Sequence, residues 1–205
     1  NGAGKTTTLK LLLNLLRPTS GKVTVLGQEM TQASKAIFQK IGYVSEEIRQ
    51  PDWMTLPSFL RYCRSFYDYW DDDLEATLRK AFRLPDNRPL KAMSRGMRMK
   101  AILLSCVCFR PELLIMDEPF SGLDPKMRDE LAGGLLEMIS GAKPCTVILS
   151  SHDIFEVERL ADHVGILVDG RLTLAEPISH LQERVRHIQV VDLSLTRELL
   201  PSLPV

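Results

Sequence analysis

The chain opens on Asn1-Gly2-Ala3-Gly4-Lys5-Thr6-Thr7, and its Gly-Lys-Thr step matches the end of the phosphate-binding loop pattern G-x-x-x-x-G-K-[ST]. Glycines in such a loop let backbone N–H groups turn toward phosphate oxygens. Lys5 would supply a point charge to the terminal phosphates, and the Thr6 hydroxyl would ligate Mg²⁺. A loop of this kind joins a strand to a helix, which points to an α/β fold. The alternative is a plain glycine-rich turn before a helix.

A helix is expected directly after this loop, from Thr6 to Leu16, because leucines recur at helical spacing at positions 9, 12, 13 and 16. Its N-terminus would direct the positive end of the helix dipole toward a bound anion. Counting back five residues from Gly4 places the first glycine of the pattern, and the strand before it, ahead of Asn1. We therefore expect the sequence to be a piece truncated within this loop.

Short apolar segments with strand character recur along the chain, at residues 23–27, 41–44, 113–116, 146–149 and 164–168. Helical segments lie between them, and this alternation predicts a mostly parallel sheet with helices on both faces. Residues 53–93 differ, because they hold many of the aromatic side chains and indicate helices broken by Pro57, Pro85 and Pro89. We expect this segment to be a helical insertion, with Asp71-Asp72-Asp73 a solvated helix start rather than a metal site.

Charge balance, apolar runs and cysteine spacing give no support for a nucleic-acid-binding, membrane-spanning or disulfide-linked chain. The 26 Lys+Arg balance the 26 Asp+Glu, so charge gives no support for non-specific binding to nucleic acid or to anionic membranes. No apolar run approaches the ~20 residues of a membrane span, and no basic-then-apolar leader opens the chain. The four cysteines form no CxxC pair, which favours buried free thiols in a reducing compartment over disulfides or metal ligands.

A second chemical motif begins at the apolar run from Leu113 to Met116, which leads directly into Asp117 and Glu118. In open α/β sheets, ligands bind beyond the C-terminal ends of the strands, so both carboxylates would face the phosphates. Asp117 would hold Mg²⁺ directly or through water, and Glu118 would orient or deprotonate a water for attack on the terminal phosphate. Taken alone, an acidic pair of this kind is equally well explained as part of a capped loop.

Four segments together resemble the ATP-binding subunit of an ABC transporter: Asn1 to Thr7, Leu114-Ile115-Met116-Asp117-Glu118-Pro119, Ser121-Gly122-Leu123-Asp124 and Ser151-His152-Asp153. The resemblance runs from residue 1 to about 180 and implies a P-loop NTPase (RecA-like) core with an inserted α-helical subdomain. It divides the chain into a first core segment at 1–52, a helical subdomain at 53–105, a second core segment at 106–180 and a C-terminal tail at 181–205. It assigns nucleotide contacts to Asn1, Gly2, Gly4, Lys5, Thr6 and Thr7.

The segment Met93-Ser94-Arg95-Gly96-Met97 resembles the signature motif of this family, usually L-S-G-G-Q. Ser94 and Gly96 match, whereas Arg95 stands in place of the first glycine and Met97 in place of the glutamine. In the family this motif opens a helix and contacts the γ-phosphate of ATP held by the other subunit. The resemblance therefore implies that Ser94 and Gly96 bind nucleotide across a subunit interface. Locally, the same residues suit an N-cap before a helix over 97–109.

Three further residues receive roles through the resemblance. Glu46 occupies the place of a glutamine that senses Mg²⁺, and a carboxylate can also ligate this ion; a solvated Glu46-Glu47 pair is the alternative. His152 follows an apolar strand and resembles the switch histidine that contacts the γ-phosphate. Asp124 would lie at the subunit interface, although the local sequence equally suits a turn before a helix.

The resemblance implies an ATP-hydrolysing motor subunit of a bacterial exporter, with ATP and Mg²⁺ as cofactors and with Glu118 and His152 as catalytic residues. Two such chains, identical or not, would enclose ATP between them, and a separate transmembrane permease subunit would dock near residues 53–70. No nucleic acid partner is expected, and the chain would lie at the cytoplasmic face of the membrane as a peripheral subunit. The alternatives are a soluble ABC ATPase without a transport role and a regulatory module that binds nucleotide without hydrolysing it.

Overall fold

The computed structural model describes residues 2–45, 47–139 and 144–184 of the chain. Asn1, Glu46 and residues 185–205 of the predicted tail therefore lie outside the described residues. Among the described residues, no helix has the length and apolar character that a membrane span requires. All four cysteines are free in the structure; Cys108 is buried as predicted, whereas Cys63, Cys106 and Cys145 are half-buried. Burial raises the pKa of the Cys63 and Cys145 thiols to about 11.

A three-stranded parallel sheet lies at the centre of the fold, in the order β3 (Ile41–Ser45), β4 (Leu113–Asp117) and β5 (Thr146–Ser150). This confirms the parallel sheet predicted from alternating strands and helices. All five residues of the central strand β4 are buried, which is typical of a strand covered on both faces. The register aligns Ser45, Asp117 and Ser150, so the C-terminal ends of the three strands meet at one edge.

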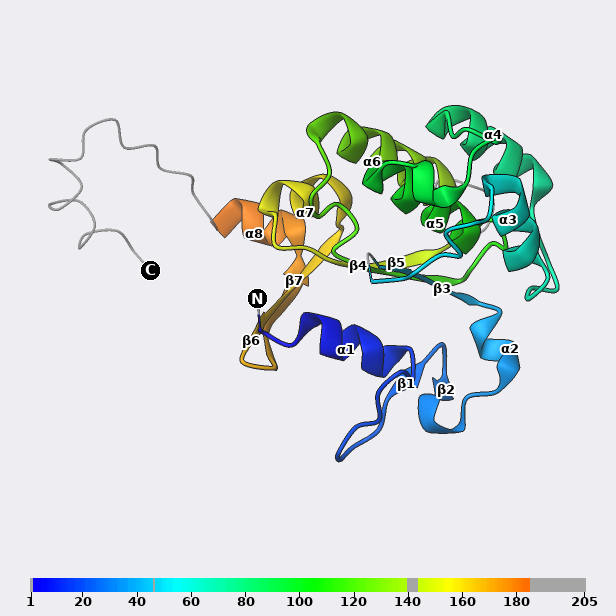
Figure 1. The fold of residues 1–205 in the computed structure, drawn as a ribbon. Helices are drawn as coiled ribbons and strands as arrows, with labels where there is room; N and C mark the ends of the chain where they lie inside the picture. Colours follow the sequence, from blue (N-terminus) through cyan, green and yellow to red (C-terminus); the bar gives the residue numbers. More distant parts are fainter. Residues whose placement is uncertain (1, 46, 140–143, 185–205) are drawn as a thin grey trace, which may run out of the picture.

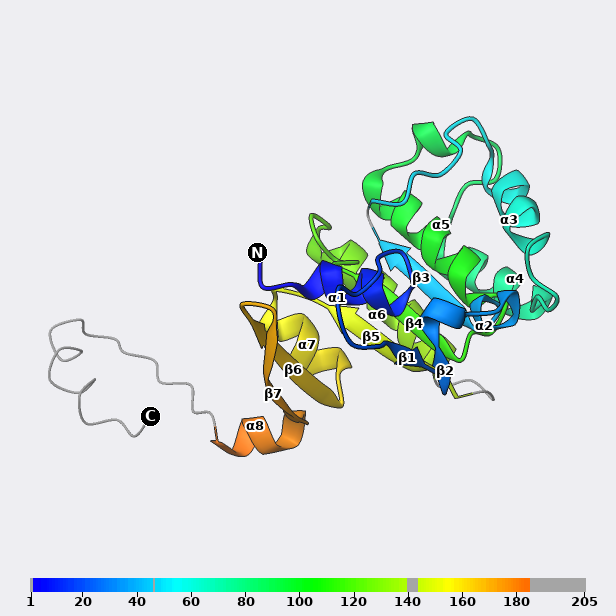
Figure 2. The same cartoon turned by 90° about the horizontal axis from the view of Figure 1, so that it is seen from below.

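Two layers cover the sheet (Figure 1). On one face lie α3 (Leu56–Arg64), α4 (Asp72–Phe82), α5 (Arg95–Val107) and α6 (Pro125–Ile139). On the other lie α1 (Lys5–Leu12) and the hairpin of β1 (Thr24–Val25) and β2 (Gln28–Glu29), which stand in front of the sheet when it is seen from below (Figure 2). Alternate residues of β4 pack on opposite faces of the sheet. Leu114 and Met116 pack against the layer of α3 to α6, and Leu113 and Ile115 pack against the layer of α1 and the hairpin.

The segment over residues 53–93 is largely helical, as its sequence indicates, but one proline acts differently from the prediction. Pro57 lies in the first turn of α3 instead of breaking a helix, because the missing N–H has no partner there in any case. Asp71 caps α4, since its carboxylate accepts the Leu74 N–H at 2.8 Å. The interpretation of residues 71–73 as a helix start is therefore confirmed.

The helix after the opening loop is shorter than predicted. α1 ends at Leu12 rather than at Leu16. Asn14 has a left-handed φ of 56°, which a right-handed helix cannot contain, and Leu15 and Leu16 are exposed. The leucine spacing therefore continues past the point at which the backbone leaves the helix.

The helix after the signature-like segment begins earlier than predicted, at Arg95 rather than at Met97, and ends at Val107. Ser94 is its N-cap, as the local sequence indicates, because the hydroxyl accepts the Met97 N–H at 3.2 Å. The division of the chain at residues 52, 105 and 180 stays a prediction, and α5 runs through the second of these points.

The last two strands form an antiparallel hairpin, β6 (His163–Val168) with β7 (Arg171–Pro177). Here the structure differs from the sequence interpretation, in which residues 164–168 belong with the strands of the parallel sheet. In the described residues no ladder joins β6 to β5, and residues of both strands line a cavity of about 630 Å³. The remaining elements are η1 (Met30–Gln32), α2 (Lys35–Phe38), η2 (Leu90–Ala92), α7 (Ile154–Leu160) and α8 (Ile178–Arg184).

Gly42 in β3 provides a test of the packing between the sheet and α5. A Cβ at this position would lie 2.8 Å from both the Cys106 carbonyl oxygen and Leu114 Cδ1. We expect Gly42→Ala to lower the free energy of unfolding by about 1–3 kcal/mol, as overpacking does. Gly133→Ala is the control, because nothing lies within 4 Å of its Cβ position and alanine favours the helix by about 0.5–1 kcal/mol. Urea unfolding measures the free energy of unfolding of both variants. Equal stability of the parent and Gly42→Ala would contradict the close packing of Gly42 against α5 and β4.

Candidate active site

The C-terminal edge of the sheet gathers the polar side chains of the candidate site. Asp117 ends β4 and is 6% exposed, and its Oδ1 accepts a hydrogen bond from Ser150 Oγ at 2.6 Å. The same carboxylate oxygen accepts one from the Thr6 hydroxyl at 3.2 Å. Ser150 ends β5 directly opposite Asp117 in the register, so a short hydroxyl side chain there reaches the carboxylate.

The opening loop lies against this edge. Gly4 caps α1 with a left-handed φ of 99°, a conformation that favours glycine. Lys5 is the first residue of α1, and its Nζ donates to Glu118 Oε1 at 2.8 Å and to the Ser151 carbonyl at 3.2 Å. The loop of the first motif and the acidic pair of the second are therefore in direct contact, 113 residues apart in the sequence.

Glu118 is held by both its backbone and its carboxylate. Its N–H donates to the Ser150 carbonyl at 3.2 Å and to Ser150 Oγ at 3.0 Å. Its Oε1 accepts from Lys5, and its Oε2 lies 2.7 Å from His152 Nδ1. The backbone has φ 49°, a left-handed conformation that costs a non-glycine residue about 1–3 kcal/mol and persists only where its surroundings impose it.

The carboxyl of Glu118 is ionised at neutral pH. Its partial burial raises its pKa, but the hydrogen bonds from Lys5 and His152 lower it by more, so the net shift is downward. A group whose pKa is lower in the folded state stabilises the fold above its unfolded-state pKa, and that contribution is lost as the pH falls through the folded-state pKa.

Removing the imidazole should therefore raise the Glu118 pKa. We expect His152→Ala to shift the carboxyl titration upward, because the contact at 2.7 Å is lost while the burial remains. Nuclear magnetic resonance titration of the Glu118 side chain measures the shift. His163→Ala is the control, since this exposed histidine lies in β6. An unchanged Glu118 titration in His152→Ala would show that the imidazole does not bind the carboxylate in solution.

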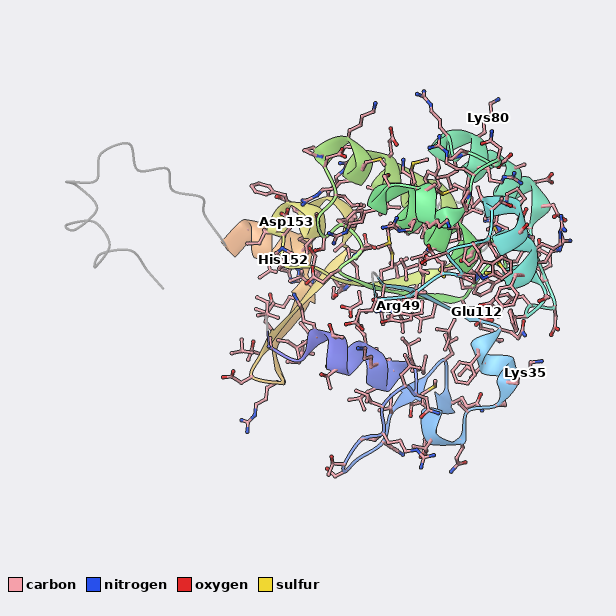
Figure 3. The ribbon with its side chains drawn as sticks, in the orientation of Figure 1. Lys35, Arg49, Lys80, Glu112, His152 and Asp153 are labelled. Atoms are coloured by element: carbon pink, nitrogen blue, oxygen red, sulfur yellow. The ribbon has the colours of Figure 1, made fainter. Side chains whose placement is uncertain are left out.

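His152 and Asp153 lie next to each other in the loop between β5 and α7 (Figure 3). The side chain of His152 is 66% exposed even though its Nδ1 contacts Glu118. Asp153 caps α7, because its Oδ1 accepts the Phe155 N–H at 3.0 Å. The loop therefore orients the imidazole through one ring nitrogen and leaves most of the ring accessible.

The oxygens at this edge fit a magnesium ion. Thr6 Oγ1 and Asp117 Oδ1 are 3.2 Å apart, and Mg²⁺ prefers such oxygens, commonly taking one or two protein carboxylates while phosphates and waters complete its shell. In the described part of the chain, no group of three or more His, Cys, Asp and Glu could hold a metal ion. Glu46, the third metal ligand predicted, lies outside the described residues.

Ser94, Gly96 and Asp124 form a second cluster, at the starts of α5 and α6. A Cβ at Gly96 would lie 2.7 Å from Met127 Cε, so the two helix starts are in close contact. Asp124 lies at the start of α6, where its Oδ1 accepts the Met127 N–H at 3.0 Å. Of the other predicted nucleotide contacts, Gly2 has a φ of 91° and Thr7 is exposed in the first turn of α1, while Asn1 lies outside the described residues.

A family model described as ABC transporter matches residues 1–121, more than half of the chain. The chain belongs to the ABC transporter family. The bacitracin transport ATP-binding protein BcrA of Bacillus licheniformis is 32% identical over 196 residues, which cover 95% of this chain and 64% of the relative. The Nod factor export ATP-binding protein I of Burkholderia orbicola is 31% identical over 185 residues, which cover 88% of this chain and 60% of the relative.

A solved ATP-binding subunit of an ABC transporter superposes on this ABC transporter chain with a TM-score of 0.76 and 28% identity, covering 90% of this chain and 78% of that one. This confirms the P-loop NTPase fold predicted from the sequence. The chain spans 58–64% of the length of three curated relatives that it matches.

Sequence reasoning missed two residues at this site. Ser150 binds both Asp117 and the Glu118 N–H, and its position at the end of a strand adjacent to β4 is a signal that could have identified it. Arg128 donates to the Leu123 carbonyl and to Asp153, both at 3.0 Å. No sequence spacing predicts the second of these contacts, because it joins helices whose packing only the fold defines.

Proposed function

We propose that this protein is the ATP-hydrolysing subunit of a membrane transporter that exports its cargo. The observation that carries the proposal is the convergence of Lys5 and His152 on the carboxylate of Glu118, beside the paired oxygens of Thr6 and Asp117. The names of the relatives, a bacitracin transport and a Nod factor export ATP-binding protein, support transport and export.

In the proposed reaction, the N–H groups of the opening loop and Lys5 bind the terminal phosphates of ATP. Glu118, kept ionised by Lys5 and His152, accepts a proton from the water whose oxygen bonds to the γ-phosphorus. The bond from that phosphorus to the β–γ bridging oxygen breaks, and ADP leaves with the electron pair. His152 orients that carboxylate through Nδ1. A magnesium ion held by Thr6 and Asp117, with Glu46 as a third predicted ligand, would neutralise charge on the phosphates.

We infer that two ATP-binding chains, identical or paralogous, enclose each nucleotide. Ser94 is exposed at the start of the 13-residue helix α5, and a helix N-terminus favours an anion. Asp124 lies at the start of α6 in the same cluster. This cluster supports a contact with the nucleotide of the partner chain.

A transmembrane permease subunit is the proposed membrane partner, at the cytoplasmic face. Four aromatic side chains of the helical segment support docking there, because Trp53, Tyr62, Phe66 and Tyr69 are all exposed, Trp53 by 73%. Trp70, in the same predicted docking segment, is buried and belongs to the core.

Mixing two impaired variants of the full-length protein, at ATP well below saturation, tests whether each ATP site is shared between two chains. A Ser94→Arg chain paired with a Lys5→Ala chain has one site with both residues intact, so partial ATPase activity should return on mixing. Mixing Ser94→Arg with a chain that carries both substitutions is the control, because no intact site can then form. If each chain hydrolyses ATP alone, the mixture shows only the average of the two activities. The proposal that each ATP site is formed by two chains is then wrong.

A further inference from the structure

The side chain of Arg128 joins two loops that flank the helical layer. Its Nε donates to the Leu123 carbonyl at 3.0 Å. Its Nη1 lies 3.0 Å from Asp153 Oδ2 and 3.0 Å from Glu156 Oε1. These three acceptors come from two segments: the turn over residues 121–124 that precedes α6, and the start of α7.

The turn at residues 121–124 is in contact with the signature-like segment. A Cβ at Gly122 would lie 2.2 Å from Arg95 Nη1, so the guanidinium group of Arg95 lies directly against this turn. Gly122 has a left-handed φ of 65°, and both observations require glycine there. The residue that departs from the family motif therefore packs on the turn whose Leu123 carbonyl Arg128 binds.

The other loop carries the histidine of the candidate active site. Asp153 directly follows His152 and caps α7 through the Phe155 N–H, and His152 Nδ1 lies 2.7 Å from Glu118 Oε2. A shift of Asp153 would therefore move the imidazole relative to the carboxylate. Arg128 is thus in contact with the turn at residues 121–124 on one side and with the residues that follow His152 on the other.

The ion pairs of Arg128 with Asp153 and Glu156 are partly buried and less exposed than a typical surface ion pair. The side chain of Arg128 is 35% exposed, and those of Asp153 and Glu156 are 29% and 14% exposed. A second ion pair between the same two helices, Arg159 with Asp129, is 53% and 63% exposed. Exposed pairs of that kind contribute little, so the two arginines offer a matched comparison.

We propose that Arg128 is a positioning residue that couples the turn at residues 121–124 to His152, so that contact with a partner chain at the turn sets the imidazole against Glu118. The inference rests on the proposed function, because it requires that His152 and Glu118 act on ATP. Arg128 acts through Asp153 and need not touch nucleotide.

The test compares Arg128→Gln with Arg159→Gln in the full-length protein. Arg128→Gln should lower kcat by about 10–100-fold and leave KM for Mg-ATP within about twofold, because the nucleotide is bound by other residues. Arg128→Lys should restore part of the loss. Arg159→Gln should leave both constants within about twofold. Equal effects of the two glutamine variants would show that Arg128 is only a structural link between helices and would overturn the proposal.

A double-mutant cycle separates positioning from stability. In a His152→Ala background, Arg128→Gln should cause no further loss of kcat, because the residue through which it acts is gone; a full additional loss overturns the proposal. Amide hydrogen exchange tests the same link without activity. Arg128→Gln should accelerate exchange at both residues 121–124 and 151–156, and unchanged exchange overturns the coupling. A parent protein without ATPase activity would refute the proposed function instead.

Discussion

Replacing Glu118 by glutamine should leave ATP binding intact and lower hydrolysis by about 10²–10⁴-fold, the range typical for loss of a general base. The amide keeps the shape of the side chain but cannot accept a proton from water. It also removes the negative partner of Lys5, which lies 2.8 Å from Glu118 Oε1. Nucleotide affinity should therefore be equal to or higher than that of the parent.

Steady-state phosphate release and isothermal titration with Mg-ATP measure the two quantities on the full-length protein. Glu112→Gln is the matched control, because Glu112 immediately precedes the same strand β4 but lies at its opposite end, exposed and paired with Lys40 (Figure 3). Turnover of Glu118→Gln within about threefold of the parent would mean that another group takes the proton.

The fold was largely predictable where one physical rule dominates. Apolar residues 113–116 before two carboxylates predict a buried strand with a polar end, and β4 is that strand. The bounds of α1 were not predictable from leucine spacing, because the positive φ of Asn14 is a backbone feature that side-chain periodicity does not report. The pairing of β6 with β7 depends on which strands lie adjacent in space, and apolar character alone does not select a partner strand.

The grouping at the candidate site was predictable from topology, and its individual contacts were not. Parallel strands bring the last residues of β4 and β5 and those that follow them to one edge, so Asp117, Glu118 and His152 were expected close together. That Lys5 binds Glu118 directly depends on the loop conformation set by Gly4. The roles of these residues in catalysis stay predictions, and the proposed substitutions test them one at a time.

Replacing Lys5 by alanine should weaken Mg-ATP binding by about 10–100-fold. A hydrogen bond to a charged group contributes about 1.5–3 kcal/mol, and 1.4 kcal/mol corresponds to a factor of ten. Lys10→Ala is the control, because Lys10 lies on the same helix and pairs with the exposed Glu47. Isothermal titration on the full-length protein measures both variants. Unchanged affinity in Lys5→Ala would mean that this ammonium group does not bind phosphate.

The Lys5→Ala variant also separates the effect on Mg-ATP binding from the effect on the base strength of the Glu118 carboxylate. Because the hydrogen bond from Lys5 lowers the pKa of Glu118, Lys5→Ala should raise that pKa and make the carboxylate a stronger base. In Lys5→Ala, the turnover number at saturating ATP should therefore decrease by a smaller factor than the affinity for Mg-ATP does. Glu118→Gln predicts the opposite pattern, with affinity kept and turnover lost. The two variants together therefore show whether Lys5 serves phosphate binding and Glu118 serves proton transfer. If both variants lost affinity and turnover to the same extent, Lys5 and Glu118 would act as one unit.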